Sequence, residues 1–190
     1  MNKYGEIEIK YKYLIKKAID ILNNINDYEH NLSHTLDVVE YTKELIDNLK
    51  VNIDVDVCII SAYWHDVGRS KLDKGHEELS AEMLKQEMLD GNYDLELIDK
   101  CYQAIVNHKW NMIPKSNEGL VIKDADKLAF LGKRRWRECL KHNFRLDGII
   151  NLLPKLKNEI LYFDESRKIY DRLIIELVNL LYEEVYCGDN

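Results

Sequence analysis

Apolar residues recur at the spacing of an α-helix along most of the chain. The first stripe predicts a helix near the amino terminus. The second predicts a helix that begins after Asn31 or Ser33, because either side chain could cap it. The two stripes comprise Leu14, Ala18, Ile21, Leu22 and Ile25, and then Leu36, Val39, Ile46 and Leu49. Strand-like alternation is confined to residues 6–13, where a short strand is the minor alternative.

The segment 57–64 is apolar on most sides. A helix with this pattern is expected to lie at the centre of a protein, because no polar face is left to meet water. Asp54 stands where it can cap this helix, and Gly68 is expected to end it.

The second half of the chain predicts further helices over 78–88, 97–106 and 120–131. Gly91 and Asn92 break the first two apart, residues 107–119 should form a loop, and residues 149–161 should form shorter pieces around Pro154. Ser166 could cap a last helix. That helix is expected to turn Ile169, Leu173, Leu177, Leu180 and Leu181 inward. The pattern therefore predicts an all-α fold, a compact single-domain helical bundle over residues 1–190.

Composition supports helix and limits the partners. The chain has only two prolines and eight glycines, which favours helix. Its formal charge of -7 argues against binding a nucleic acid polymer, because phosphate backbones are bound by clustered positive charge. No uncharged stretch is long enough to span a membrane. The four cysteines form no CxxC pair, so we expect reduced thiols and a cytoplasmic protein.

Candidate chemistry begins with His65 and Asp66, an adjacent pair at the end of the apolar segment. A buried imidazole beside a carboxylate is costly without a partner. His34, in the first turn of a predicted helix, and Asp126, within an apolar segment, pose the same problem. A divalent cation would satisfy all four groups and leave positions for water and substrate.

Five short motifs follow one another over about half of the chain. They are His34-Thr-Leu-Asp-Val-Val, Ala62-Tyr-Trp-His65-Asp66-Val-Gly-Arg69, Gly75-His76-Glu77-Glu78-Leu-Ser80-Ala81-Glu82, Ile105-Val-Asn-His108 and Lys123-Asp-Ala-Asp126-Lys-Leu128. Each motif is weak alone, but in this order they resemble the HD-domain superfamily of metal-dependent phosphohydrolases, in its small stand-alone form. Arg69 replaces the lysine that usually follows HD-x-Gly, so the resemblance leaves the substrate open.

The resemblance implies an all-α bundle whose motif-bearing region spans about residues 28–132, with helices in 133–187 completing it. It implies that His34, His65, Asp66 and Asp126 ligate one divalent ion, which could be Mn, Fe, Co, Ni, Zn or Mg. In relatives that have histidines at the places of His76 and His108, these hold a second metal or contact the substrate phosphate. A helix-capping role for His76 and a plain loop position for His108 remain open.

The implied activity is hydrolysis of a phosphate ester or anhydride of a small molecule, preferably a nucleotide, by a metal-activated water. Asp66, His76 and His108 are the expected catalytic residues. Arg69 and Lys127 could bind substrate or stabilise the transferring charge. In the cationic cluster after Asp126, which continues to Lys141 and Arg145, Arg134 and Arg137 could share a face that binds a substrate with several phosphates.

Several interpretations remain open. A di-iron oxygenase is one alternative, and it requires both His76 and His108 as ligands. A non-catalytic nucleotide-binding module is another, and a homodimer is open as well. We expect His30 to lie beside a ligand or on the surface, and Asp124 and His142 to be solvated.

Overall fold

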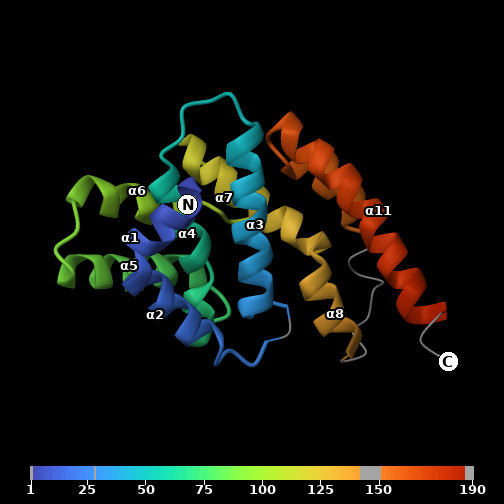
Figure 1. The fold of residues 1–190 in the computed structure, drawn as a ribbon, viewed down its shortest axis with the longest axis horizontal. Coiled ribbons are helices and arrows are strands. Elements are labelled where there is room, and N and C mark those ends of the chain that lie inside the picture. The colour runs from blue at the N-terminus through green and yellow to red at the C-terminus, as the bar shows by residue number, and fades with distance from the viewer. Residues whose placement is uncertain (1, 28, 142–150, 187–190) are drawn as a thin grey trace.

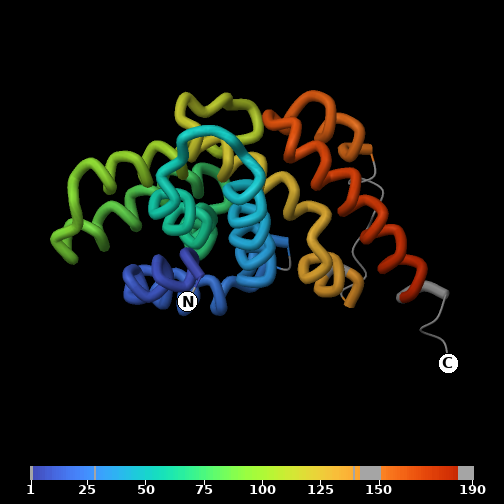
Figure 2. Tube along the Cα trace, turned by 45° about the horizontal axis from the view of Figure 1, so that its top comes forward, coloured from blue at the N-terminus to red at the C-terminus, as the bar shows by residue number. Residues whose placement is uncertain are grey.

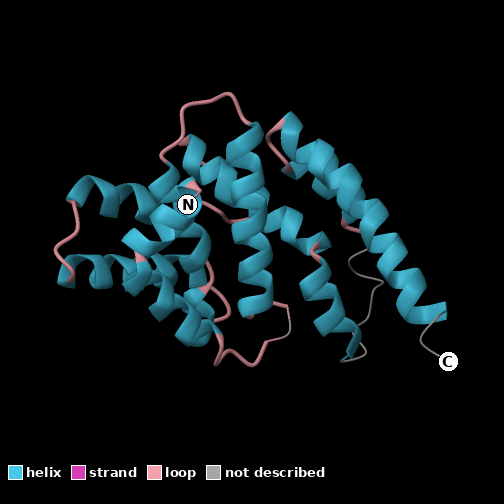
Figure 3. Ribbon diagram, in the orientation of Figure 1, coloured by secondary structure: helices cyan, strands magenta, loops and turns pink. Residues whose placement is uncertain are grey.

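The computed structural model describes residues 2–27, 29–141 and 151–186, and within them it contains helices and loops but no strand (Figure 3). The all-α prediction is therefore confirmed. The helices, labelled in Figure 1, are α1 (Lys3–Lys10), α2 (Lys12–Leu22), α3 (Leu32–Asn48), α4 (Val55–Trp64), α5 (His76–Asp90), α6 (Leu95–Val106), α7 (Asn117–Leu128), α8 (Lys133–Lys141), α10 (Leu153–Lys155) and α11 (Asp164–Tyr186). Short 3-10 turns η1 (Val67–Ser70) and η2 (Ala129–Leu131) follow α4 and α7, and a π-helical turn η3 (Leu156–Ile160) follows α10.

Helix α4 lies at the centre, as its uniformly apolar sequence predicts. Every residue from Val57 to Trp64 is buried, and the helix packs against α2, α3, α6 and α7. Asp54 caps it by accepting a hydrogen bond from the Val57 backbone N–H. The Trp64 indole N–H donates to the Leu14 carbonyl at 3.1 Å, which joins the end of α4 to α2.

The predicted end of this helix at Gly68 is wrong, because α4 already stops at Trp64. Gly68 lies in η1, where α5 passes close by. A Cβ atom at this position would lie 2.3 Å from the His76 carbonyl oxygen and 2.8 Å from the Ser80 backbone nitrogen. The Gly68 N–H donates instead to the Ser80 hydroxyl at 2.7 Å. Glycine is needed here for the close approach of two backbones and not for a helix cap.

The amino-terminal segment is helical, so the strand alternative for residues 6–13 is wrong. Its polar positions face solvent along α1 and α2, while the Tyr4 ring is buried. The Tyr4 hydroxyl lies 2.9 Å from the Lys43 carbonyl oxygen and 2.8 Å from the Asp47 carboxylate of α3. In Figure 2 the two amino-terminal helices lie together beneath α4, and both contact it.

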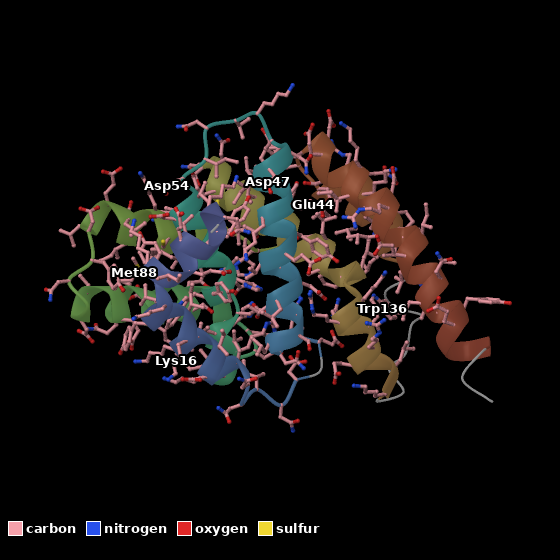
Figure 4. All side chains as sticks on the ribbon, viewed as in Figure 1. Lys16, Glu44, Asp47, Asp54, Met88 and Trp136 are labelled. Carbon is pink, nitrogen blue, oxygen red and sulfur yellow. The ribbon has the colours of Figure 1, made fainter. Side chains whose placement is uncertain are left out.

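Helices α5 and α6 form a hairpin on one side of the central helices, and α8 and α11 lie on the other side (Figure 1). The break at Gly91 and Asn92 is confirmed, since Gly91 follows the last residue of α5 and Asn92 has a positive φ of 55°. On the opposite side, the Arg172 guanidinium of α11 lies 2.6 Å from the Glu44 carboxylate of α3. Glu44 is labelled between these two helices in Figure 4.

Two predictions about the last helix and its partner are corrected. Ser166 does not cap α11, which begins two residues earlier at Asp164. The Ser166 hydroxyl instead donates to Asp124 at 2.5 Å. Asp124, predicted to be solvated, is fully buried and also accepts hydrogen bonds from the Tyr162 and Phe163 backbone N–H groups at 2.9–3.0 Å. It therefore joins α7 to the start of α11.

Ile169, Leu173, Leu177 and Leu180 of α11 are buried as expected, and Leu181 is half-buried. Cys58 and Cys101 are buried free thiols. His142 and Arg145 lie outside the described residues. None of the helices in the described ranges combines the length and the apolar character that crossing a membrane requires.

Candidate metal centre

Three helix ends bring the predicted ligands together. His34 lies in the first turn of α3, which Asn31 caps by accepting a hydrogen bond from the Ser33 N–H at 2.9 Å. His65 and Asp66 follow the last residue of α4, and Asp126 lies in the last turn of α7. Because α3, α4 and α7 pack against one another, these three ends meet at one buried place.

The donor atoms of these side chains are separated by the distances expected around one ion. His34 Nε2 lies 3.3 Å from His65 Nε2, 3.2 Å from Asp126 Oδ1 and 3.7 Å from Asp66 Oδ2. His65 Nε2 lies 3.6 Å from Asp66 Oδ2 and 4.0 Å from Asp126 Oδ1. Ligands about 2.1 Å from a metal must lie roughly 3–4 Å from one another. The donor atoms of His34, His65 and Asp66 therefore lie close enough together to hold a divalent cation, and Asp126 Oδ1 lies within 4.0 Å of both imidazoles.

The second carboxylate oxygen of Asp66 faces two further histidines. His76 Nε2 lies 3.0 Å and His108 Nε2 lies 3.9 Å from Asp66 Oδ1. His76 is the first residue of α5 and His108 follows α6, so the α5–α6 hairpin supplies both. Asp66, His76 and His108 form a second buried group that could hold a metal. The two groups share the Asp66 carboxylate, so this side chain could serve as a ligand in both.

Three imidazoles are oriented by backbone carbonyl groups. His65 Nδ1 lies 2.8 Å from the Ala62 carbonyl oxygen, His76 Nδ1 lies 2.7 Å from that of Asp73, and His108 Nδ1 lies 2.5 Å from that of Ile105. A carbonyl oxygen can only accept, so each Nδ1 donates a hydrogen bond and each ring turns its Nε2 toward the centre. Ligating histidines are commonly held in this way.

The protonation states also suit a metal. Burial lowers the pKa of His34 to about 4 and that of His108 to about 3, so both imidazoles are neutral at physiological pH. Burial alone would raise the pKa of Asp66, but the His65 and His76 imidazoles and the Arg69 guanidinium hold it well below its usual range. Neutral nitrogens and an ionised carboxylate are the forms that bind cations.

Asp126 is ionised for a similar reason. Burial acts to raise its pKa, but the Lys127 ammonium and the His34 imidazole hold it well below the usual range. Two ionised carboxylates thus lie together in the interior. Such a pair is stable only beside positive charge, which Arg69 and Lys127 supply in part and to which a divalent cation would add.

Two of the predicted cations touch this centre directly. Arg69 Nε lies 3.0 Å from Asp66 Oδ2, and Lys127 Nζ lies 2.5 Å from Asp126 Oδ2. Lys127 is buried, and its ammonium lies 5.3 Å from the centre of the Trp110 ring. Each cation lies beside a proposed ligand. A phosphate bound at the centre would therefore lie near positive charge.

Arg134 and Arg137 are placed elsewhere. Arg134 pairs with Asp37 and, at 2.7 Å, with Glu40, both further along α3 than His34. Arg137 is exposed and lines, with Arg134, a cavity of about 240 Å³ between α3, α8 and α11. The structure therefore does not bring this pair to the metal centre. The buried cation of α8 is Arg135, which the helical spacing alone does not single out.

His30 lies beside the centre. It precedes the first residue of α3, its Nδ1 lies 2.8 Å from Asp27 Oδ2, and its ring centre lies 5.8 Å from that of His34. It is half-buried. The sequence predicts a place beside a ligand or on the surface, and His30 has features of both.

Comparison with known proteins supplies the family context. The sequence model of the HD domain matches residues 31–131. This range contains the four histidines and the two aspartates of the centre. Ribonuclease Y of Ureaplasma parvum serovar 3 is 32% identical over 108 residues, covering 55% of this chain and 21% of the relative. The deoxyguanosinetriphosphate triphosphohydrolase-like protein of Caldanaerobacter subterraneus subsp. tengcongensis is 24% identical over 117 residues, covering 55% of this chain and 34% of the relative. The chain thus matches only a minor part of the length of these curated relatives.

Two solved structures share the fold over nearly the whole chain. A predicted HD superfamily hydrolase from an uncultured Thermotogales bacterium aligns with a TM-score of 0.74 and 21% identity, covering 96% of this chain and 97% of the other. Bacillus subtilis YpgQ, solved in complex with ADP, aligns with a TM-score of 0.66 and 18% identity, covering 95% and 97%. At these identities the likeness shows the fold.

Proposed function

Because this chain belongs to the HD-domain family, we propose that it is a metal-dependent phosphohydrolase whose ion is held by His34, His65, Asp66 and Asp126. The observation that carries the proposal is that each of two buried carboxylates lies 3.2–4.0 Å from both of two buried imidazoles. The substrate is a phosphate ester or anhydride of a small molecule, and a nucleotide is the preferred class.

A divalent ion in this place would make water a nucleophile near neutral pH and offset the charge on phosphoryl oxygens. The chain's own groups then have separate tasks. Asp66 accepts a hydrogen bond from the attacking water and orients it. Lys127 and Arg69, each in contact with one carboxylate, stabilise negative charge that develops on the phosphate. His65, His76 and His108 are held rigid by their backbone partners, so the site needs little rearrangement.

Three observations support a small, nucleotide-like substrate. The relative from Caldanaerobacter is named for hydrolysis of a nucleoside triphosphate, and YpgQ was solved with ADP. The chain itself has a formal charge of -7, which disfavours a long polyanion. Local cations at the centre can still bind one compact phosphate group.

The proposal is tested with a panel of nucleotides, sugar phosphates and a generic phosphate ester. We expect phosphate release in the presence of Mn, Co, Ni or Mg, loss of this activity after treatment with a chelator, and recovery when the ion is returned. Nucleotides should be the best substrates. Absence of phosphate release from every compound with every ion would refute the proposed reaction.

We further propose that His76 and His108, together with Asp66, would hold a second ion. Removing one ligand of that ion should change the metal count without emptying the first site. We expect two ions per chain in the wild type and one in His108→Ala, measured by elemental analysis of protein loaded with Mn. His30→Ala, which removes an imidazole beside the centre, should retain both. A count of one ion in the wild type would leave His76 and His108 as contacts to the substrate phosphate.

The same geometry also suits the di-iron oxygenase alternative, because His76 and His108 both face the shared carboxylate. The two functions differ in their need for oxygen. Phosphate release that proceeds equally well without oxygen supports hydrolysis. Oxygen consumption by iron-loaded protein, with no phosphate released, would favour the oxygenase.

A further inference from the structure

Arg135 is a buried cation with an ion pair on only one of its three guanidinium nitrogens. Its residue is 2% exposed, and its Nη2 lies 3.2 Å from the Glu29 carboxylate. Its guanidinium carbon lies 4.4 Å from the centre of the Phe130 ring. The neighbouring Trp136, labelled in Figure 4, donates its indole N–H to the Phe130 carbonyl at 2.7 Å. This bond holds the first turn of α8 against η2 and thereby places Arg135.

Two of its three nitrogens lack an acceptor. Arg135 Nε and Nη1 are buried and have no hydrogen-bond partner among the residues that the structure describes. An ionised donor in the interior without an acceptor is among the costliest polar groups a fold can carry. A cation retained in this condition is suited to receive an anion, and the guanidinium has the geometry that binds phosphate oxygens.

Arg135 is linked to the metal centre through Phe130. Phe130 follows Asp126 by four residues, so both lie on the same side of the α7–η2 segment. Lys127 Nζ lies 2.5 Å from Asp126 Oδ2 and 6.0 Å from the Phe130 ring centre. The Lys127 ammonium and the Arg135 guanidinium, which lies 4.4 Å from the ring centre, are therefore both neighbours of the Phe130 ring.

The segment before α3 also connects Arg135 to the metal centre. Glu29, the partner of Arg135, directly precedes His30, whose ring lies 5.8 Å from that of His34. The Glu29 side chain is 32% exposed, so the guanidinium lies one ion pair below the surface. The Phe130 ring and the segment 29–34 thus each connect Arg135 to residues of the metal centre.

We propose that Arg135 binds a second anionic group of the substrate, linked to the phosphate that reacts at the metal centre. The substrate class is then nucleoside diphosphates and triphosphates in preference to monophosphates. This inference rests on the proposed function. It assigns recognition of the second phosphate to Arg135, because the neighbouring Arg134 is already paired with Asp37 and Glu40. The second phosphate takes the donors on Nε and Nη1, and Glu29 keeps the guanidinium oriented.

The test compares ADP with AMP, which differ by one phosphate, in calorimetric binding to metal-loaded protein. We expect the wild type to bind ADP about 10- to 100-fold more tightly than AMP, the change that hydrogen bonds to a charged group produce. Arg135→Leu should remove this preference and leave AMP binding unchanged. Arg135→Lys, which keeps the charge but loses the planar fork, should retain a small part of it, and it decides the matter if the leucine variant does not fold. Lys16→Leu, on the exposed surface of α2, controls for the loss of one positive charge.

Three results would overturn the inference. They are a wild type without preference for ADP, an Arg135→Leu variant with an unchanged preference, and equal weakening of AMP and ADP, which would indicate a structural role. Failure of the proposed function is separate. If no phosphate compound is hydrolysed but the preference for ADP depends on Arg135, the reaction is wrong and the anion site stands. If hydrolysis occurs without that dependence, the reaction stands and the anion site is wrong.

Discussion

Replacing Asp66 by asparagine is expected to abolish both metal binding and phosphate hydrolysis. Asp66 is the side chain that faces both groups of the centre, with Oδ2 toward His34 and His65 and Oδ1 toward His76 and His108. The amide has nearly the same shape but removes the negative charge and turns one acceptor into a donor. We expect kcat/KM to fall on the order of 1,000-fold or more, as for the loss of a group that stabilises charge in a transition state.

The measurement is steady-state hydrolysis of the best substrate in the panel, with metal content determined on the same samples. Asp99→Asn is the matched control. Asp99 is exposed on α6, so this substitution makes the same chemical change on the surface. Its activity should equal that of the wild type. An Asp66→Asn variant with more than a tenth of the wild-type kcat/KM would show that this carboxylate is not at the reacting centre.

The second large effect is expected on stability, at Asp124. This buried carboxylate accepts hydrogen bonds from the Tyr162 and Phe163 backbone N–H groups and from the Ser166 hydroxyl. Alanine would leave these donors without their acceptor in a largely buried place, and each orphaned donor costs about 1–3 kcal/mol. We expect Asp124→Ala to lower the free energy of unfolding by about 3–5 kcal/mol, because it orphans three donors at once.

Chemical denaturation followed by circular dichroism measures this change. Asp164→Ala is the matched control, because Asp164 begins the same helix but its side chain is 84% exposed. Surface substitutions of this kind usually change stability by less than about 0.5 kcal/mol. If Asp124→Ala were no more destabilising than Asp164→Ala, the network that joins α7 to α11 would not contribute to stability.

Local periodicity predicts much of this fold, and three of its errors share one physical cause. The uniformly apolar segment before His65 predicts the central helix, and Asp54 predicts its cap. The errors at Gly68, Ser166 and Asp124 all concern contacts with a distant segment. A helical pattern shows that Asp124 faces away from Asp126, but only tertiary packing shows that α11 covers that face. Ser166 resembles a helix cap in sequence and is instead bound to this carboxylate across the fold.

The candidate site divides in the same way. The chemistry of His34, His65, Asp66 and Asp126 and the order of their motifs predict a common centre, and the structure places these residues together. The cationic cluster of α8 is different. Spacing along a helix shows that Arg134 and Arg135 point in different directions, but not which of them faces inward. That depends on how α8 packs against η2, which the bond from Trp136 to Phe130 determines.

The central claim is that four side chains from three helix ends hold a divalent ion. Crystals soaked in Mn and measured on both sides of the manganese absorption edge test it most directly. We predict an anomalous peak enclosed by the Nε2 atoms of His34 and His65 and the carboxylates of Asp66 and Asp126. Crystals that give no peak at this position, or a peak only at another position, would contradict the account.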